Sequence, residues 1–482
     1  MLRLALLVFS AFVFDLASAR AQATGGDKPA EAAASADAPT AAAPAEATAA
    51  PTSTPAEAAP LPSSSHEVIA EPMSVGVVPV PAPIEMQAAP MPVVGADKRW
   101  QIGFDGYLRM QLGCVRPDGM CGITLGTSDD ARLNPYVGRN DGFALGGARL
   151  NVRGYYSDLL YLRLGFDGSL TSYDDPNSAV GELATGLRDA YVRFAMHPKA
   201  QLFVGRFKPP FDVEELTATE DQLFVNRSLE SRGVMRHEGF GGDAPGFAPG
   251  RQLGLMLASD AALAMGESMH LGYAAAVTNG NSGDATLNDN DTPAAWGRVF
   301  MRWNDRASAS KSRTQDEEGP ASHVLEGGAL VGLSGFYNEV TTGVPPNRFR
   351  DRVVGGAFDA ALQLSVFDLS GQLVFAQTSF MSRPGTSAVR SVGGHAQLGV
   401  NIPDTGFTPA YRFALYNPAW YAEGDEASGA DYDRVMHHTV GVRYRCDKTP
   451  TVVHLEYTHS REQAGRTLPN DRVEAALQVN FE

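Results

Sequence analysis

The residues that could carry out chemistry in this sequence are histidines, carboxylates and arginines at alternating positions of short segments. His454 and Glu456 are two residues apart, so on an extended strand both face the same side, where an acid–base pair or a metal site is conceivable. His437 and His438 are adjacent and would face opposite sides, which does not suit joint metal binding. The sequence has no Gly-x-Ser-x-Gly elbow, phosphate-binding glycine loop or HExxH motif. A polar lining explains His454 and Glu456 more simply, and we predict neither catalysis nor a cofactor.

Arginine dominates the polar positions of the alternating segments. These positions carry 11 arginines against six carboxylates, although the whole chain has a net charge of −16. Arginine suits phosphate oxygens because its planar guanidinium presents a fork of donors. The same side chains would serve equally well in Arg–Asp pairs that brace a wall, and both interpretations stay open. The arginines are Arg109, Arg149, Arg153, Arg163, Arg193, Arg298, Arg302, Arg412, Arg443, Arg445 and Arg472, and the carboxylates are Asp105, Asp167, Asp189, Asp359, Glu456 and Glu474.

The alternation itself predicts β-strands with one apolar and one polar face. In residues 100–112, for example, Ile102, Phe104 and Leu108 alternate with Asp105, Tyr107 and Arg109. Sixteen segments fit this pattern, an even number, as expected for a bacterial single-chain barrel. They are residues 100–112, 148–156, 160–167, 190–194, 201–207, 252–258, 270–278, 296–303, 329–338, 351–366, 371–380, 395–402, 408–416, 438–445, 452–459 and 472–481.

The connectors favour a membrane barrel over a soluble all-β protein. Short turns such as 157–158, 198–199, 368–369 and 403–404 alternate with long Gly- and Asp-rich segments, and only the charged connector 304–326 departs from this order. Tight turns on one side and long loops on the other are typical of transmembrane barrels. We therefore predict an all-β fold, a transmembrane antiparallel barrel of about 16 strands over residues 98–482. A secreted soluble β protein is the alternative fold.

The first 97 residues have a different character. Arg3 followed by the apolar run 4–14 and small residues predicts a signal peptide over residues 1–21, so we expect export. Residues 22–97 are rich in Ala, Pro, Ser, Thr and Glu, which predicts a disordered periplasmic linker. The acidic net charge argues against nucleic-acid binding. Cys114 and Cys121 lie close enough in sequence to form a disulfide in an oxidising compartment or to remain free thiols.

One segment resembles a known family. Val204-Gly205-Arg206-Phe207-Lys208-Pro209-Pro210-Phe211, then Glu214-Glu215-Leu216-Thr217, then Phe224-Val225-Asn226-Arg227-Ser228-Leu229, is similar to the motifs of the phosphate-selective porin O and P family. Asn226 stands where that family commonly has Glu. The resemblance implies a 16-stranded homotrimeric porin of the outer membrane whose third long loop folds into the barrel and narrows the pore.

These observations together predict a passive diffusion channel in contact with outer-membrane lipid, with small anions such as phosphate as solutes. Arg206, Lys208 and Arg227 are the candidates for the constriction, and Arg109, Arg149, Arg153, Arg163, Arg193 and Arg443 for the rest of the anion path. Acidic connectors such as 288–291 and 423–426 would repel phosphate at the mouth. A general non-selective porin and a structural barrel that tethers the envelope are the alternatives.

Overall fold

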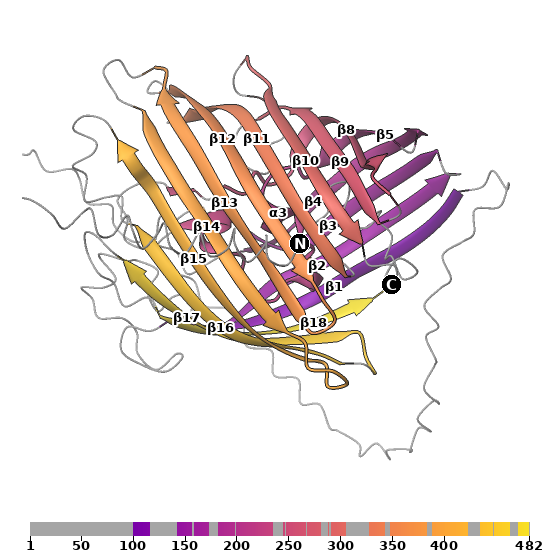
Figure 1. The fold of residues 1–482 in the computed structure, drawn as a ribbon, viewed down its shortest axis with the longest axis vertical. Coiled ribbons are helices and arrows are strands. Elements are labelled where there is room, and N and C mark those ends of the chain that lie inside the picture. The colour runs from indigo at the N-terminus through magenta and orange to yellow at the C-terminus, as the bar shows by residue number, and fades with distance from the viewer. Residues whose placement is uncertain are drawn as a thin grey trace, which may run out of the picture. The chain divides into compact units, whose positions relative to one another are not determined.

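The strands of this chain form one closed antiparallel barrel. The computed structural model describes residues 100–115, 142–156, 159–172, 182–197, 199–234, 244–245, 247–266, 268–280, 288, 291–304, 327–342, 348–382, 388–422, 434–446, 448–462 and 471–481. Within these residues, 16 strands pair with their neighbours in chain order, and β1 closes the ring against β18. Figure 1 shows the tilted strands side by side, with indigo β1 next to yellow β18. The predicted fold class and strand number are confirmed.

The barrel strands correspond one to one with the 16 predicted segments. They are β1 (Trp100–Val115), β2 (Gly142–Tyr156), β3 (Leu160–Ser172), β4 (Glu182–His197), β5 (Ala200–Phe207), β8 (Gln252–Ala264), β9 (Met269–Thr278), β10 (Ala294–Asn304), β11 (Gly328–Thr342), β12 (Phe349–Gln363), β13 (Phe367–Phe380), β14 (Val389–Val400), β15 (Phe407–Ala422), β16 (Val435–Arg445), β17 (Thr451–Glu462) and β18 (Arg472–Phe481).

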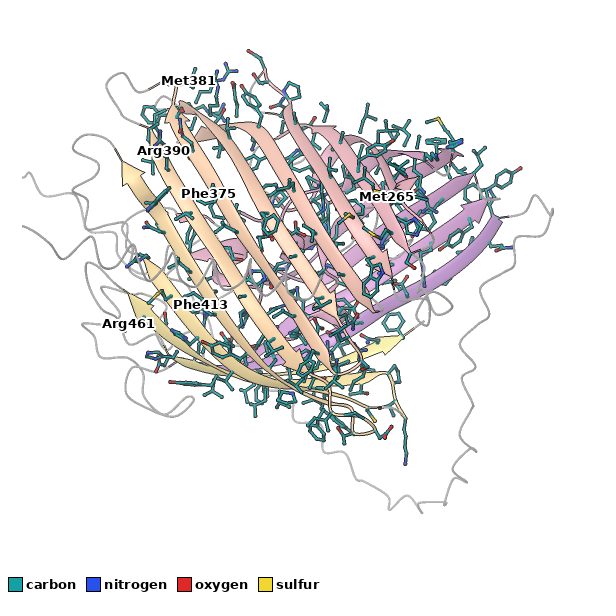
Figure 2. The ribbon with its side chains drawn as sticks, viewed as in Figure 1. Met265, Phe375, Met381, Arg390, Phe413 and Arg461 are labelled. Atoms are coloured by element: carbon teal, nitrogen blue, oxygen red, sulfur yellow. The ribbon has the colours of Figure 1, made fainter. Side chains whose placement is uncertain are left out.

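The outer face of the barrel is apolar because alternate residues of each strand point outward. Ile102 of β1 is 64% exposed and Leu333 of β11 is 62% exposed, whereas Tyr107 and Leu330, which face inward on the same two strands, are buried. Phe375 lies on this outer face in the middle of the sheet (Figure 2). A largely apolar outer face of this kind suits lipid as its surroundings. Among the described residues, no helix has the length and apolar character that a membrane span requires.

The short turns lie at the end of the barrel that also carries the start of β1 and the end of β18. The predicted turn at Pro403-Asp404 is confirmed, with Asp404 at a φ of 59° and Thr405 N–H donating to Ile402 O at 3.4 Å. The predicted turn at Asp368-Leu369 is wrong, because the hairpin closes earlier through Leu364 N–H and Phe367 O at 2.8 Å. Asp368 and Leu369 instead begin β13, paired with Gln363 and Leu362. The predicted turn at 157–158 and most of the charged connector 304–326 lie outside the described residues.

Several strands are longer than the sequence predicted, mostly at the end that carries the long loops. β4 has 16 residues and β15 also has 16, whereas alternation marked five and nine of them. The added residues include Gly142, Gly146 and Gly147 of β2, which present no side chain to either face. A search for alternating apolar and polar side chains cannot detect strand positions that are occupied by glycine.

An arginine introduced on the outer face tests the exposure of that face to lipid. Leu333 lies in the middle third of β11, so Leu333→Arg should lower the free energy of unfolding in lipid vesicles by about 2–4 kcal/mol. Leu364→Arg, in the short turn after β12, is the matched control and should cost about 0–1 kcal/mol because it lies near the interface. Denaturant titration measures both values. Equal costs at the two positions would contradict a lipid-facing β11.

Candidate functional site

The segment between β5 and β8 forms a loop that folds into the barrel. It contains α3 (Val213–Leu216), a 3-10 turn η1 (Thr219–Asp221), α4 (Leu229–Arg232) and the small sheet of β6 (Gly233–Val234) with β7 (Ala244–Pro245). Its side chains Phe211, Phe224 and Leu229 are almost completely buried. We call the described residues between 208 and 251, which are 208–234, 244–245 and 247–251, the inward loop. Its position matches what the family resemblance implied for the third long loop.

Aromatic packing holds the first part of the inward loop against one side of the wall. The Phe211 ring lies 4.7 Å from Phe336 and 6.2 Å from Trp296, measured between ring centroids, and Trp296 and Phe336 stack at 5.3 Å. Trp296 Nε1–H donates to Thr278 Oγ1 at 2.9 Å. The interior on this side is an apolar core rather than a polar lining. Its other members include Phe203, Phe207, Met256, Phe300, Leu330 and Val374.

Hydrogen bonds from β17, β18 and β1 hold the later part of the inward loop. Val225 N–H donates to Glu456 Oε2 at 2.6 Å, and Arg109 Nη2 donates to Val225 O at 2.7 Å. Asn226 Nδ2 donates to Glu474 Oε2 at 2.6 Å and to Glu456 Oε1 at 3.2 Å. These bonds give a physical reason for Asn226 in place of the family's usual Glu. A glutamate at this position would bring a third carboxylate to Glu456 and Glu474, whereas an amide supplies donors.

Two further wall arginines fasten the backbone of the inward loop. Arg412 Nη1 donates to Asn226 O at 2.9 Å, and its guanidinium lies 4.5 Å from the centroid of the Phe224 ring. Arg443 Nη1 donates to Asp221 O at 3.2 Å. Arg109 and Arg443, two candidates for the anion path, therefore contact the loop backbone. Their guanidinium groups satisfy loop carbonyl groups that would otherwise lie buried without donors.

A buried cluster of carboxylates lies where α3 and α4 meet β13 and β14. Asp212 caps α3 and accepts hydrogen bonds from Glu214 N–H at 3.1 Å, Ser231 Oγ–H at 2.6 Å and Gln372 Nε2–H at 3.1 Å. His395 of β14 lies 2.5 Å from Glu230 Oε1 through Nδ1 and 3.6 Å from Glu214 Oε1 through Nε2. Burial raises the pKa of Asp212 to about 6, and the nearby Glu230 and Glu214 act in the same direction. Asp212 therefore titrates close to neutral pH.

A second cluster, rich in cations, joins the inward loop to β2, β3 and β4. Glu215 pairs with Arg227 and lies 3.4 Å from Arg251 Nη1, and Arg251 Nε lies 3.1 Å from Asp189 Oδ1. Asp189 also interacts electrostatically with Arg163, Arg149 and Lys208. Arg149 and Arg188 approach Asp167 at 3.6 Å and 3.5 Å. We call this group the cation cluster. Among the described residues it combines six cations with three carboxylates, Asp167, Asp189 and Glu215.

The predicted site residues thus separate into groups. Arg149, Arg163, Lys208 and Arg227 meet in the cation cluster, as described above. Arg153 pairs with Asp105 at 2.7 Å, and the Arg193 guanidinium lies 4.8 Å from the centroid of the Tyr161 ring.

Arg206 lies elsewhere. It pairs in register with Ala190 and Leu253, and Leu253 is 42% exposed on the outer face. Strand alternation places Arg206 in the same outward-facing row, while Phe203 and Phe207 take the inward positions. The structure therefore does not bring Arg206 to the interior arginines.

Sequence reasoning missed several members of these clusters. Arg251 precedes its strand and Arg188 lies at an irregularity between β3 and β4, so neither follows a clean alternation. Glu214 and Glu215 belong to the motif that carried the family resemblance, but the motif gave them no partner. The partners of Glu214, His395 and Arg412, come from strands far along the chain. Those of Glu215, Arg227 and Arg251, come from later parts of the loop, and spacing reveals neither set.

A solvent-open cavity lies beside the inward loop, near the ends of β12 to β16 that carry the short turns. Loop residues form one side, and amide, carboxylate and arginine side chains form the other. Arg445, whose side chain is half exposed, lies 3.7 Å from Asp221 on this side. The principal wall residues are Gln363, Asp368, Gln397, Arg412, Arg443 and Arg445.

Comparison with known proteins confirms the family resemblance. Residues 125–330 match the model of the family described as phosphate-selective porin O and P. No curated protein sequence matches the chain.

Solved structures similar to this chain include the following three. OmpT of Vibrio cholerae in its trimer form has 10% identity and a TM-score of 0.47, covering 79% of this chain and 99% of its own. The channel DcaP of Acinetobacter baumannii has 11% identity and a TM-score of 0.47, covering 79% and 97%. The anion-selective porin from Comamonas acidovorans has 13% identity and a TM-score of 0.46, covering 80% and 100%.

The buried Asp212 predicts a pH-dependent inward loop. The pKa of Asp212 is raised to about 6 in the folded protein. The stability that the protonated carboxyl gives to the inward loop is therefore complete below about pH 4 and is lost as the pH rises through 6. We expect the conductance of the wild-type channel to change between pH 5 and 7 as Asp212 titrates. The near-isosteric Asp212→Asn variant should lack this part of the pH dependence. Single-channel recording across this range measures it. An unchanged pH profile in Asp212→Asn would contradict this role.

Proposed function

We propose that this chain, an outer-membrane porin by its closed barrel and its family region, allows small anions such as phosphate to diffuse passively across the membrane. The observation that carries the proposal is the cation cluster. Six cationic side chains surround Asp167, Asp189 and Glu215. Asp212 and Glu214 also interact electrostatically with Arg227, so the six cations outnumber five nearby carboxylates. An excess of positive charge inside a protein wall attracts anions, because a low-dielectric surround focuses the field.

Exposure supports a role for the cation cluster in contact with solutes. The side chain of Arg227 is 27% exposed and that of Arg188 is 23% exposed, although both lie within the barrel. Their carboxylate partners Glu215 and Asp167 are only 2% and 4% exposed. The cations therefore lie nearer to water than the carboxylates that hold them. A passing anion would meet guanidinium groups first.

The cavity beside the inward loop supplies a second cationic position. Arg443 and Arg445 line it from β16, two residues apart on the same inward face. Amide groups of Gln363 and Gln397 line the opposite strands. We propose that an anion passes from the cation cluster to this cavity. Asp221 and Asp368 in the same wall keep the attraction moderate, which allows the solute to leave.

A general, non-selective porin is the second candidate. Close ion pairs within the wall favour it, because Arg153 lies 2.7 Å from Asp105 and Arg298 lies 2.5 Å from Asp359. Paired charges of this kind brace a water-filled wall and cancel much of each other's field. The two candidates differ in ion selectivity and agree on passive diffusion.

We also propose that the chain assembles as a homotrimer, as its family resemblance implies, and that residues 22–97 lie in the periplasm after removal of residues 1–21. Electrophoresis in SDS without boiling should show a species about three times the mass of the boiled chain. Mass spectrometry of the mature protein should give an N-terminus near residue 22. A monomeric unboiled band would contradict the trimer without affecting the channel.

Planar-bilayer recording in a KCl gradient tests the selectivity. The reversal potential should have the sign of an anion-selective pore, and added phosphate should reduce the chloride current by occupying the cationic positions. A cation-selective reversal potential without phosphate block would contradict the anion proposal and leave the non-selective porin.

Paired substitutions in the cation cluster test its part in selectivity. Glu215→Gln removes the carboxylate between Arg227 and Arg251, so it should shift the reversal potential toward anions and strengthen phosphate block. Arg227→Gln should shift both in the opposite direction. Lys448→Gln, in an exposed short turn, is the control of equal charge change and should leave selectivity unchanged. A shift in Lys448→Gln as large as that in Arg227→Gln, which removes the same charge, would indicate a general charge effect and contradict the role of the cluster.

A further inference from the structure

A group of polar side chains interrupts the apolar outer face on β15, β16 and β17. His438 of β16 and His459 of β17 are cross-strand partners, with ring centroids 6.5 Å apart. Tyr411 and Tyr457 flank them, each 43% exposed. Arg461, two residues beyond His459 on the same strand face, is exposed at the arrowhead end of β17 (Figure 2). We call His438, His459 and Arg461 the outer-face basic group.

Hydrogen bonds fix both imidazole rings. Tyr411 Oη lies 2.8 Å from His438 Nδ1. His459 Nδ1 lies 2.8 Å from Asp471 Oδ1, and the same carboxylate accepts hydrogen bonds from Tyr457 Oη–H at 2.7 Å and Ser460 N–H at 3.1 Å. Each ring thus uses Nδ1 within the protein, and among the described residues these bonds leave Nε2 as the second ring nitrogen for a ligand.

The position of this group is unusual for a lipid-facing surface. Immediately below it on the same rows, Val440 is 56% exposed and Leu455 is 51% exposed. Imidazole and guanidinium groups are costly beside acyl chains, so groups at this position require polar partners. Tyrosines at the boundary mark the level where acyl chains meet headgroups. The outer-face basic group therefore lies at headgroup height.

Topology indicates which leaflet those headgroups belong to. His438 is near the start of β16 and His459 near the end of β17, so both lie at the end joined by the longer connectors 423–434 and 463–471. Long loops of outer-membrane barrels face the exterior, and short turns face the periplasm. The group therefore faces the outer leaflet.

We propose that the outer-face basic group binds the phosphate of a phosphorylated glycolipid in the outer leaflet. Arg461 supplies a permanent charge and forked donors, which fit phosphate oxygens. The two rings lie on neighbouring strands with their centroids 6.5 Å apart, close enough for one phosphate to reach both. Arg434, exposed just before β16, adds a further cation at this end. Asp471, the carboxylate that faces the group, is engaged by Tyr457, Ser460 and His459. The site is separate from the interior and independent of the solute that the pore passes.

Native mass spectrometry of the delipidated full-length protein in detergent tests the proposal. The probe is diphosphorylated lipid A, compared with lipid A from which both phosphates have been removed. The wild-type protein should retain the diphosphorylated form at least severalfold better. The combined variant His438→Gln, His459→Gln and Arg461→Gln should lose this preference, whereas Lys448→Gln should keep it.

Two controls distinguish a wrong proposal from a misfolded variant. The combined variant should still migrate as a folded barrel before boiling and should keep the wild-type reversal potential, because its changes lie outside the interior. Millimolar inorganic phosphate should not displace the lipid if the acyl chains contribute to binding. Equal retention of both lipid forms by the wild type, or an undiminished preference in the combined variant, would overturn the proposal.

Discussion

The inward loop carries charged groups into the barrel interior, and each of these charges requires a partner there. Asp212, Glu214, Glu215 and Glu230 are all nearly inaccessible to solvent. An isolated carboxylate would be costly to bury, so its partners determine where the loop can lie. The wall supplies them from several strands, including Gln372, His395 and Arg412. Arg251, in the loop itself, bridges Glu215 to Asp189 of β4. The loop and the wall are therefore specified together.

This requirement explains how the interior is divided. Where Phe211 meets Trp296 and Phe336, the wall is aromatic and contributes packing. Where the backbone of Val225 and Asn226 crosses to β17, β18 and β1, the wall is polar and contributes hydrogen bonds. The remaining side, at β2 to β4, keeps an excess of arginine over carboxylate. Arg251 ties this side to the loop as well, and it is the side along which we propose that the anion passes.

The barrel could be predicted from the sequence because alternate residues of each membrane-spanning strand face lipid and the barrel interior. On β1, one face carries Ile102, Phe104 and Leu108, and the other carries Asp105, Tyr107 and Arg109. Only one orientation of such a strand places its apolar side chains in lipid. The roles of individual arginines could not be predicted in the same way. Arg109 and Arg443 share the inward face with Arg149 and Arg163, but only contacts with the loop show that the first two hold its backbone. Arg206 was misplaced because it was selected from the motif and not from the alternation of its strand, in which Phe203 and Phe207 take the inward positions.

The central claim is that the inward loop lies inside the barrel against β18, and a short-range cross-link tests it most directly. In a background with Cys114, Cys121 and Cys446 replaced by Ser, the thiols of the double variant Asn226→Cys and Glu474→Cys should be joined by a short bifunctional reagent, because the native side chains form a hydrogen bond of 2.6 Å. Peptide mapping should recover residues 226 and 474 in one linked product. No linked product, together with rapid labelling of the thiol at position 226 by a maleimide too large to enter the barrel, would place the loop outside and contradict the account.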